Sequence, residues 1–240
     1  MLEIEGLEKH YGDLKAVKGL NLTIQPGEIF CMLGANGAGK TTTLMVSLGF
    51  TDPTRGTVKI CGIDVTRDPL EAKKHVAYVS ENVMLYGNFT ARQNLEFFTK
   101  LGGVKDATDQ DYKQVLKRVG LQDDAFNRRV KGFSKGMRQK LGIAIAIMKD
   151  AEVILLDEPT SGLDPKSGAE FLQLLNELRA ENKAIWMTTH DIFRAKEIAD
   201  RVGIMVAGTL VQLLTREELQ QQDLEALYVQ YVSQATEEAV

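Results

Sequence analysis

Cysteine is scarce in this 240-residue chain, which contains only Cys31 and Cys61. The two lie in separate apolar stretches, without the C-x-x-C spacing that is typical of metal and redox sites. Two cysteines are too few for a disulfide framework, so we expect buried thiols in a protein of a reducing compartment.

Long apolar runs and a strong excess of one charge are also missing. The longest apolar runs, such as 143–148, are far shorter than the roughly 20 residues that span a bilayer. The N-terminal stretch lacks the basic-then-apolar order of a signal peptide. A net charge of -4 gives no basic field for a nucleic acid. We therefore expect a soluble chain that binds no nucleic acid and meets a membrane only through a partner.

The pattern of apolar residues predicts an α/β protein. Apolar runs of strand length occur at 20–24, 28–33, 57–60, 76–80, 153–156, 184–188 and 202–206. The later runs alternate with helical segments that begin at Pro165 and Ile192, which is typical of a parallel sheet. A chain with 44% hydrophobic residues can bury such a core together with a subdomain.

The sequence divides into three parts. Residues 85–150 carry apolar residues at helical spacing and predict an inserted α-helical subdomain. Residues 1–84 and 151–214 are assigned to a discontinuous α/β core, with a mixed or parallel sheet and an N-terminal antiparallel β subdomain. Residues 215–240 form a polar C-terminal tail, which we expect to be helical.

Residues 34–41 read GANGAGKT and match the pattern G-x-x-x-x-G-K-[ST]. They follow a predicted strand and open a predicted helix at about 39–48, as a P-loop requires. Small residues let backbone N–H groups turn toward phosphates at a helix start that favours anions. The predicted nucleotide-binding residues of this stretch are Asn36, Gly37, Ala38, Gly39, Lys40, Thr41 and Thr42. Lys40 is predicted to contact the β- and γ-phosphates, and the Thr41 hydroxyl to bind Mg²⁺. We therefore expect a P-loop NTPase core.

Two acids, Asp157 and Glu158, end the apolar run 153–156. Ligands of open α/β sheets bind beyond the carboxyl ends of strands, so both acids should face the phosphates. Asp157 suits Mg²⁺, and Glu158 suits a general base for the attacking water. His190 follows another predicted strand and can lie on the same rim, whereas His75 has no such support and is predicted to be structural.

The stretch 133–140, FSKGMRQK, opens a predicted helix that carries an unusual charge. Ser134 is a good N-cap residue, but Lys135 and Arg138 add positive charge where the helix dipole is already positive. Gly136 leaves the backbone uncovered. An anion that binds at this helix start would explain all three features.

Tyr11 precedes Gly12 near the N-terminus. A tyrosine at this place can simply pack against the core. An adenine ring, however, needs a flat partner, and Tyr11 is the candidate that this part of the sequence offers.

In this order and spacing, the motifs resemble the ATPase subunit of an ATP-binding cassette (ABC) transporter. The resemblance covers residues 1 to about 215 and includes Ser161-Gly-Leu-Asp164 and His190. It implies ATP and Mg²⁺ as ligands and two cassettes, identical or different, stacked head to tail around two ATP molecules. Ser134 and Gly136 would then bind the γ-phosphate on the partner's P-loop. It also implies ATP hydrolysis coupled to transport through separate transmembrane permease subunits, at the cytoplasmic face of the cell membrane.

The sequence departs from the family pattern at two places. The usual LSGGQ signature reads Phe133-Ser-Lys-Gly-Met137, and the glutamine that usually follows the strand 76–80 is Glu81. A carboxylate at position 81 can bind Mg²⁺ but adds negative charge near the γ-phosphate. Both departures resemble the ABC-2 type exporters, which include drug and polysaccharide efflux ATPases.

The stretch after Glu81 is expected to meet the transmembrane subunit, because it joins the ATP-binding core to the helical insert. Its apolar residues Val83, Leu85, Tyr86 and Phe89 are expected to be exposed. Two alternatives stay open: a soluble ABC-type ATPase that acts on DNA or ribosomes, and a P-loop kinase or GTPase. The first usually needs a coiled-coil insertion or two cassettes, and the second has no use for FSKGM.

Overall fold

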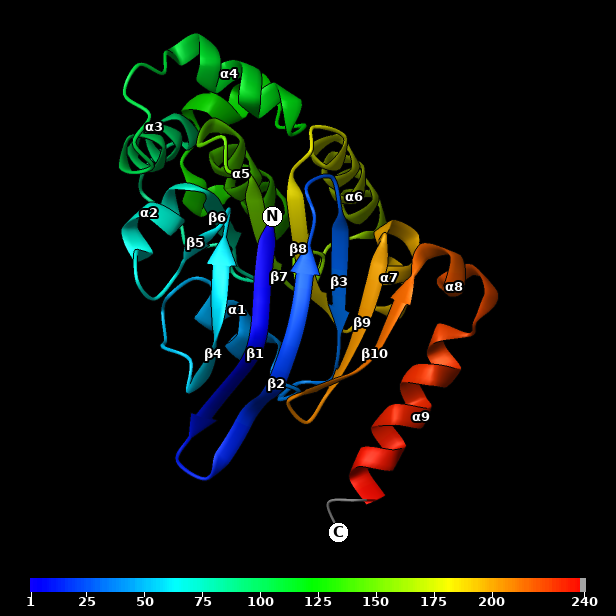
Figure 1. The fold of residues 1–240 in the computed structure, drawn as a ribbon. Helices are drawn as coiled ribbons and strands as arrows, with labels where there is room; N and C mark the ends of the chain where they lie inside the picture. Colours follow the sequence, from blue (N-terminus) through cyan, green and yellow to red (C-terminus); the bar gives the residue numbers. More distant parts are fainter. Residues whose placement is uncertain (238–240) are drawn as a thin grey trace.

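The computed structural model describes residues 1–237, with the side chains of 1–233, and contains two β-sheets covered by helices (Figure 1). The smaller sheet is antiparallel and has the strand order β2-β1-β4-β5. Its strands are β1 (Leu2–Tyr11), β2 (Leu14–Ile24), β4 (Arg55–Ile60) and β5 (Ile63–Asp64).

The larger sheet has the strand order β10-β9-β3-β8-β7-β6. Its strands are β3 (Ile29–Leu33), β6 (Val76–Val79), β7 (Val153–Asp157), β8 (Ala184–Thr189), β9 (Arg201–Val206) and β10 (Thr209–Thr215). β10 runs antiparallel to β9, whereas the other neighbouring strands are parallel. The carboxyl ends of the parallel strands therefore lie at one edge, where ligands of open α/β sheets bind.

The central strands of the larger sheet are buried on both faces, which explains their continuous apolar runs. In β3, Ile29, Cys31 and Leu33 belong to the core under the helices, whereas Phe30 and Met32 belong to the core under the smaller sheet. Because β3 lies between two cores, the loop that follows it starts from a fixed position.

Nine α-helices complete the described part of the chain. They are α1 (Lys40–Ser47), α2 (Pro69–Lys74), α3 (Ala91–Leu101), α4 (Asp109–Arg118), α5 (Lys135–Met148), α6 (Pro165–Ala180), α7 (Ile192–Ile198), α8 (Arg216–Gln221) and α9 (Leu224–Glu237). The starts of α2 to α8 carry side-chain caps: Thr90 and Thr108 form capping boxes, for example, and Asp164 caps α6 with Pro165 as its first residue.

Helices α3, α4 and α5 lie together at one end of the molecule, in the green part of the ribbon (Figure 1). They come between β6 and β7 in the chain, together with two short 3-10 helices at Asp123–Asn127 and Val130–Gly132. The predicted fold class is confirmed. The domain boundaries at residues 84, 150 and 214 stay predictions.

Sequence reasoning missed β1, β10, α2 and the first half of β2. The alternation in β1 is interrupted at Gly6, which has a φ of 56°, and the register with β2 shifts between Ile4 and Leu7. This bulge places Leu2, Ile4 and Leu7 in the core although their spacing is not strictly two. The start of α2 did carry a signal, because Asp68 caps it before Pro69.

The tail is helical in α8 and α9, as expected, and residues 238–240 lie outside the described part of the chain.

The expectation of two buried cysteines is half correct. Cys31 is buried, and burial raises the pKa of its thiol, whereas Cys61 lies in a tight turn and is partly exposed.

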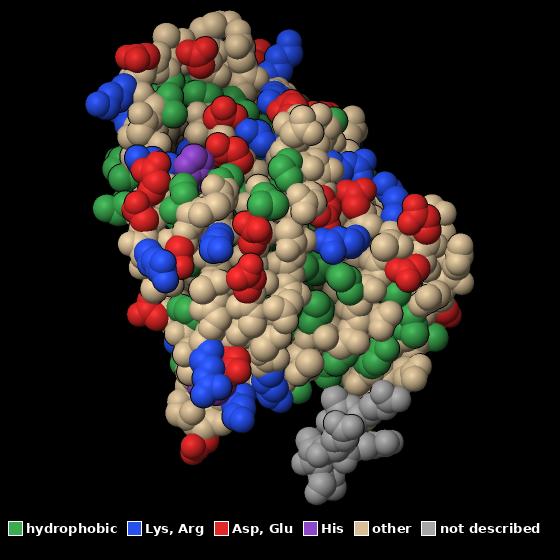
Figure 2. Space-filling view, in the orientation of Figure 1, with side chains coloured by type: hydrophobic (Ala, Val, Ile, Leu, Met, Phe, Trp, Pro, Cys, Tyr) green, Lys and Arg blue, Asp and Glu red, His purple; other side chains and the backbone are tan. Residues whose placement is uncertain are grey.

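In residues 1–237, no helix combines the length and the apolar character that crossing a membrane demands. Basic and acidic side chains are interspersed over most of the face in Figure 2, and lysine and arginine side chains gather near its lower left edge.

Candidate functional site

The loop 34–39 connects the carboxyl end of β3 to the start of α1. It is glycine-rich for steric reasons. A Cβ atom at Gly39, whose φ is 106°, would collide with the backbone oxygen of Ala16, and one at Gly34 would lie 2.6 Å from the backbone oxygen of Met205. At Gly37, with a φ of 83°, a Cβ atom would meet open space. The backbones of β2 and β9 therefore leave no room for a side chain at Gly39 and Gly34, whereas a Cβ atom at Gly37 would contact neither strand.

The first residue of α1, Lys40, folds its side chain back over this loop. The ammonium donates hydrogen bonds to the backbone oxygens of Gly34, at 2.5 Å, and Ala35, at 3.3 Å, and lies 3.7 Å from Glu158 Oε1. The side chain is 6% exposed, and burial lowers the pKa of Lys40, opposed by the charges of Glu158 and Asp157. No side chain caps the start of α1, so its backbone N–H groups point toward the same space.

Asp157 is the last residue of β7 and is held from two sides. The Thr41 hydroxyl donates to Asp157 Oδ2 at 3.2 Å, and the Thr188 hydroxyl of β8 donates to Asp157 Oδ1 at 2.5 Å. The oxygens of Thr41 and Asp157 are ligands that suit a small hard cation such as Mg²⁺. Sequence reasoning missed Thr188, although a polar residue inside a buried strand is the signal that could have found it.

Glu158 follows β7 in the left-handed conformation, with a φ of 47°. Its Oε2 atom lies 3.0 Å from Nδ1 of His190, whereas its buried Oε1 atom accepts no hydrogen bond and is near only the Lys40 ammonium. A buried oxygen without a hydrogen bond lowers the stability of the fold. A non-glycine residue with positive φ, such as Glu158, is also strained, and such strain is concentrated at functional sites. Glu158 thus keeps an unused hydrogen-bond acceptor beside the Lys40 ammonium.

This space is a cavity of about 740 Å³, a size typical of small-molecule sites. Of the predicted residues, those that line it are Tyr11, Asn36, Gly37, Ala38, Gly39, Lys40, Thr41, Thr42, Glu81, Asp157 and Glu158. Lys15 and Lys18 of β2 also line the cavity and add cations that the sequence did not reveal. Tyr11 is 49% exposed, so its ring is available for stacking. The fit to a nucleotide with Mg²⁺ rests on this lining and on the Glu158 oxygen that has no hydrogen-bond partner.

Three predicted site residues lie apart from the cavity lining. His190 reaches the site only through Glu158. Ser134 caps α5 by accepting a hydrogen bond from the Met137 backbone N–H at 3.2 Å, and Gly136 packs near Leu163 and Ser167. The start of α5 therefore does not contribute to the cavity of its own chain.

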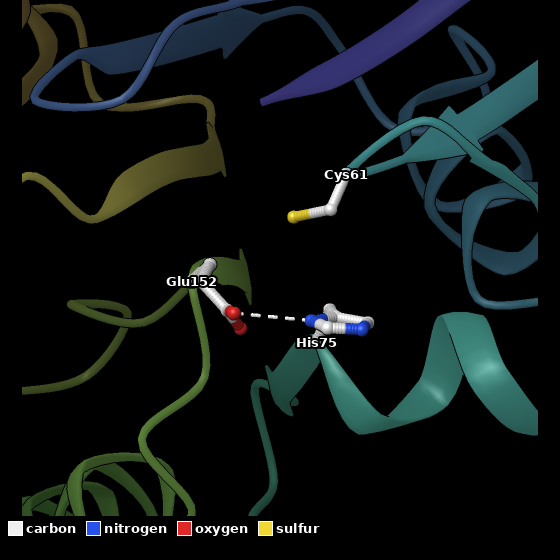
Figure 3. A group of neighbouring side chains, drawn as sticks. All are labelled: Cys61, His75 and Glu152. Carbon is white, nitrogen blue, oxygen red and sulfur yellow. Dashed lines mark hydrogen bonds and ion pairs between the residues drawn. The ribbon is translucent and has the colours of Figure 1, made fainter.

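A second group of polar side chains lies at the opposite edge of the larger sheet. His75 Nδ1 is 3.0 Å from Glu152 Oε1, and Cys61 lies beside them, with ligand atoms of the three within 4.8 Å of one another (Figure 3). The backbone oxygen of His75 accepts from the N–H groups of Glu152 and Val153, which joins the starts of β6 and β7. This contact is consistent with the structural role predicted for His75.

The P-loop between β3 and α1, with acids at the end of β7, defines a nucleotide-binding α/β protein. Comparison with known proteins defines the family. The family model described as ABC transporter matches residues 17–161, more than half of the chain. The chain belongs to the ABC transporter family, of which it is an ATP-binding domain.

Two curated relatives and one solved structure illustrate the similarity. The ABC transporter ATP-binding protein NatA of Bacillus subtilis (strain 168) is 37% identical, over 82% of this chain and 81% of NatA. The bacitracin transport ATP-binding protein BcrA of Bacillus licheniformis is 36% identical, over 98% of this chain and 76% of BcrA. A dimeric, post-hydrolysis ATP-binding cassette bound to ADP and Pi has a TM-score of 0.81 and 27% identity, over 90% of this chain and 99% of that one.

Replacement of Gly39 by alanine is expected to destabilise the fold more than replacement of Gly37. Both residues have positive φ, so both changes strain the backbone, but the new Cβ atom meets the Ala16 oxygen only at position 39. The overpacking should cost about 1–3 kcal/mol more in the free energy of unfolding. Urea denaturation of Gly39→Ala and Gly37→Ala measures the difference, and equal costs would contradict this close contact at Gly39.

Proposed function

We propose that the chain is the ATP-hydrolysing subunit of an exporter. The observation that carries the proposal is the convergence of Lys40, Asp157 and Glu158 on one cavity beside the P-loop. These groups supply a phosphate-binding cation, a metal ligand and a base, which phosphoryl transfer to water requires.

ATP is the proposed ligand of the cavity. The backbone N–H groups of 36–39 surround the phosphates, Lys40 binds the β- and γ-phosphates, and the Thr42 hydroxyl adds a hydrogen bond. The Tyr11 ring stacks on adenine at the other end of the cavity. When Mg²⁺ is bound, Thr41 and Asp157 hold it, and it offsets charge on the transferred phosphate.

Glu158 is the proposed general base. Its side chain lines the cavity, and its Oε1 atom has no hydrogen-bond donor, so the carboxylate can accept a proton from a water at the γ-phosphate. His190 holds the second oxygen of the same carboxylate, at 3.0 Å, and is 60% exposed. The imidazole therefore orients Glu158 and can itself reach a γ-phosphate in the closed state.

Hydrolysis is proposed to need two cassettes. Ser134 and Gly136 lie at a helix start that does not line the cavity of its own chain, which is the arrangement expected if they bind the nucleotide of a partner. The dimeric, post-hydrolysis cassette that this fold resembles supports such a pair, which is either a homodimer or a pair of different cassettes.

The relatives support a role in export, because one of them, from Burkholderia lata, is named Nod factor export ATP-binding protein I. Permease subunits on separate chains are the proposed partners, which would hold this chain at the cytoplasmic face of the membrane. The surface for them lies after Glu81, where Met84 is 85% exposed and Tyr86 is 48% exposed. Tyr86 also contacts the rings of Phe89, Phe97 and Phe98.

The expected exposure of this surface needs one correction. Val83 and Leu85 are only partly exposed, because both pack against the main hydrophobic core. Met84 and Phe89 carry the exposed apolar area together with Tyr86. Burial alternates along 83–86, as it does where successive side chains of a segment point to opposite sides, so every second apolar residue is exposed.

Glu158→Gln should lower ATP turnover by about 10²-fold or more, because the variant keeps the shape of the side chain and loses the base. ATP should still bind, and the ATP-bound dimer should accumulate, as gel filtration can measure. Lys40→Ala should instead weaken binding itself. Glu152→Gln, at the other end of β7, is the matched control and should leave turnover within about twofold. Unchanged turnover in Glu158→Gln would exclude the proposed base.

Ser134→Arg should abolish hydrolysis but not ATP binding by the monomer, because it places a large side chain against the partner's nucleotide. In a mixture with Lys40→Ala subunits, each mixed dimer has one site with both lesions and one with neither. If one intact site can hydrolyse ATP without the other, the mixture should recover part of the ATP turnover. If both sites are required together, the mixture should stay inactive. Failure of Ser134→Arg monomers to bind a fluorescent ATP analogue would show that α5 serves its own nucleotide.

A cysteine at Met84 should crosslink to a multi-spanning membrane protein, because the side chain is 85% exposed on the proposed permease surface. Val229→Cys on α9, where the side chain is 60% exposed, is the matched control and should give no such product. The parent chain measures the background from Cys31 and Cys61. Labelling of a soluble partner alone would favour the soluble ABC-type ATPase.

A further inference from the structure

Three segments that are distant in the sequence meet at one oxygen atom of Glu81. The Ser161 hydroxyl donates to Glu81 Oε1 at 3.0 Å, and the Lys135 ammonium lies 3.3 Å from the same atom. The hydrogen bond from Ser161, followed by the charge of Lys135, lowers the pKa of Glu81, so its carboxylate stays charged. The aliphatic part of Lys135 passes Gly162, where a Cβ atom would lie 3.7 Å from Lys135 Cδ.

The backbone of this junction is fixed separately from its side chains. Gln139 of α5 is fully buried and donates to the backbone oxygens of Ser80, at 3.3 Å, and Glu81, at 2.9 Å. The start of α5 and the segment after β6 thus form one unit. The Lys135–Glu81 ion pair lies at its surface, with the side chains 32% and 44% exposed.

Glu81 and Lys135 are also the two charged positions where this chain departs from the pattern expected of its family. Each charge alone is unfavourable: Glu81 lines the phosphate-binding cavity, and Lys135 opens a helix whose dipole is already positive there. Side by side, the two charges compensate each other. Neither a glutamine at 81 nor a glycine at 135 could form this ion pair.

We infer that Glu81 and Lys135 act as one positioning pair, in which Lys135 neutralises Glu81 until a partner subunit brings its own ATP. This inference rests on the proposed function. On closure, the Lys135 ammonium passes from the Glu81 carboxylate to the γ-phosphate on the partner, and Glu81 is released toward the Mg²⁺ of its own cavity. The exchange links the two sites, because one subunit's Lys135 senses the partner's nucleotide and its Glu81 faces its own.

The exposure of the pair suits such an exchange. Ion pairs between half-exposed side chains are weak, so a phosphate with more negative charge can replace the carboxylate. Ser161 keeps a hydrogen bond to Glu81 in the open subunit. Loss of the ammonium leaves the Glu81 carboxylate with the neutral Ser161 hydroxyl as its remaining donor of the two, so the carboxylate can turn toward the cavity when Mg²⁺ is bound there.

A double-mutant cycle tests the pair. Lys135→Gln should lower ATP turnover about tenfold or more, because it removes a phosphate contact and leaves Glu81 uncompensated. The double variant Glu81→Gln/Lys135→Gln should be at least about threefold more active than Lys135→Gln, since interacting residues are not additive. Lys135→Arg keeps the charge and should stay within about threefold of the parent. A double variant no more active than Lys135→Gln, or an inactive Lys135→Arg, would overturn the inference.

Two further measurements separate this inference from the proposed function. In the absence of Mg²⁺, monomers of Lys135→Gln should bind ATP about threefold to tenfold more weakly than the parent, because the uncompensated Glu81 carboxylate repels the phosphates. The double variant should bind metal-free ATP like the parent, whether or not the parent hydrolyses ATP. The charge-reversed variant Glu81→Lys/Lys135→Glu restores an ion pair but places a carboxylate against the partner's γ-phosphate. Its turnover should stay lost, and recovery would overturn the exchange.

Lys74→Gln is the matched control for the loss of an exposed ion pair. Lys74 contacts Glu71 at 2.5 Å on α2, away from the cavity lining. Its loss should leave turnover and the affinity for metal-free ATP within about twofold of the parent. A Lys74→Gln effect as large as that of Lys135→Gln would overturn the specific role of the Glu81 pair.

Discussion

The buried ammonium of Lys40 is the interaction on which the site depends. Two neighbouring acids, Asp157 and Glu158, end a strand that is buried on both faces, and their charges repel each other. Lys40 lies 3.7 Å from Glu158 and also holds the backbone of the P-loop, so one cation joins the loop to the end of β7. A buried charge without a partner would be strongly unfavourable. The same contact therefore offsets part of the cost of burying the Lys40 charge and sets the positions of the phosphate site and the base.

The surroundings of this contact combine rigid and adjustable parts. β3 lies between two hydrophobic cores, so the P-loop starts from a fixed position. The helical insert is joined to the cavity in a different way, through the buried amide of Gln139 and the half-exposed pair of Lys135 and Glu81. Polar contacts of this kind can change partners without repacking a core.

Local patterns predicted much of the fold and of the site. The P-loop, the acids after β7 and the cap at Ser134 each depend on a short run of sequence, and the structure has them as expected. β1 was missed because its bulge breaks the alternation. Thr188 and the ion pair of Glu81 with Lys135 were missed for another reason. Their roles depend on which strands and helices become neighbours, and no local pattern records that.

The atoms that press on Gly34 and Gly39 include backbone oxygens, those of Met205 and Ala16. Every residue type carries such an oxygen, so a smaller side chain at position 16 or 205 cannot move it away. In genetic terms, a second substitution in β2 or β9 should rarely restore function to a protein in which Gly34 or Gly39 has been replaced. Function should return mainly by reversion to glycine. The strands can therefore vary in sequence during evolution while the two glycines cannot.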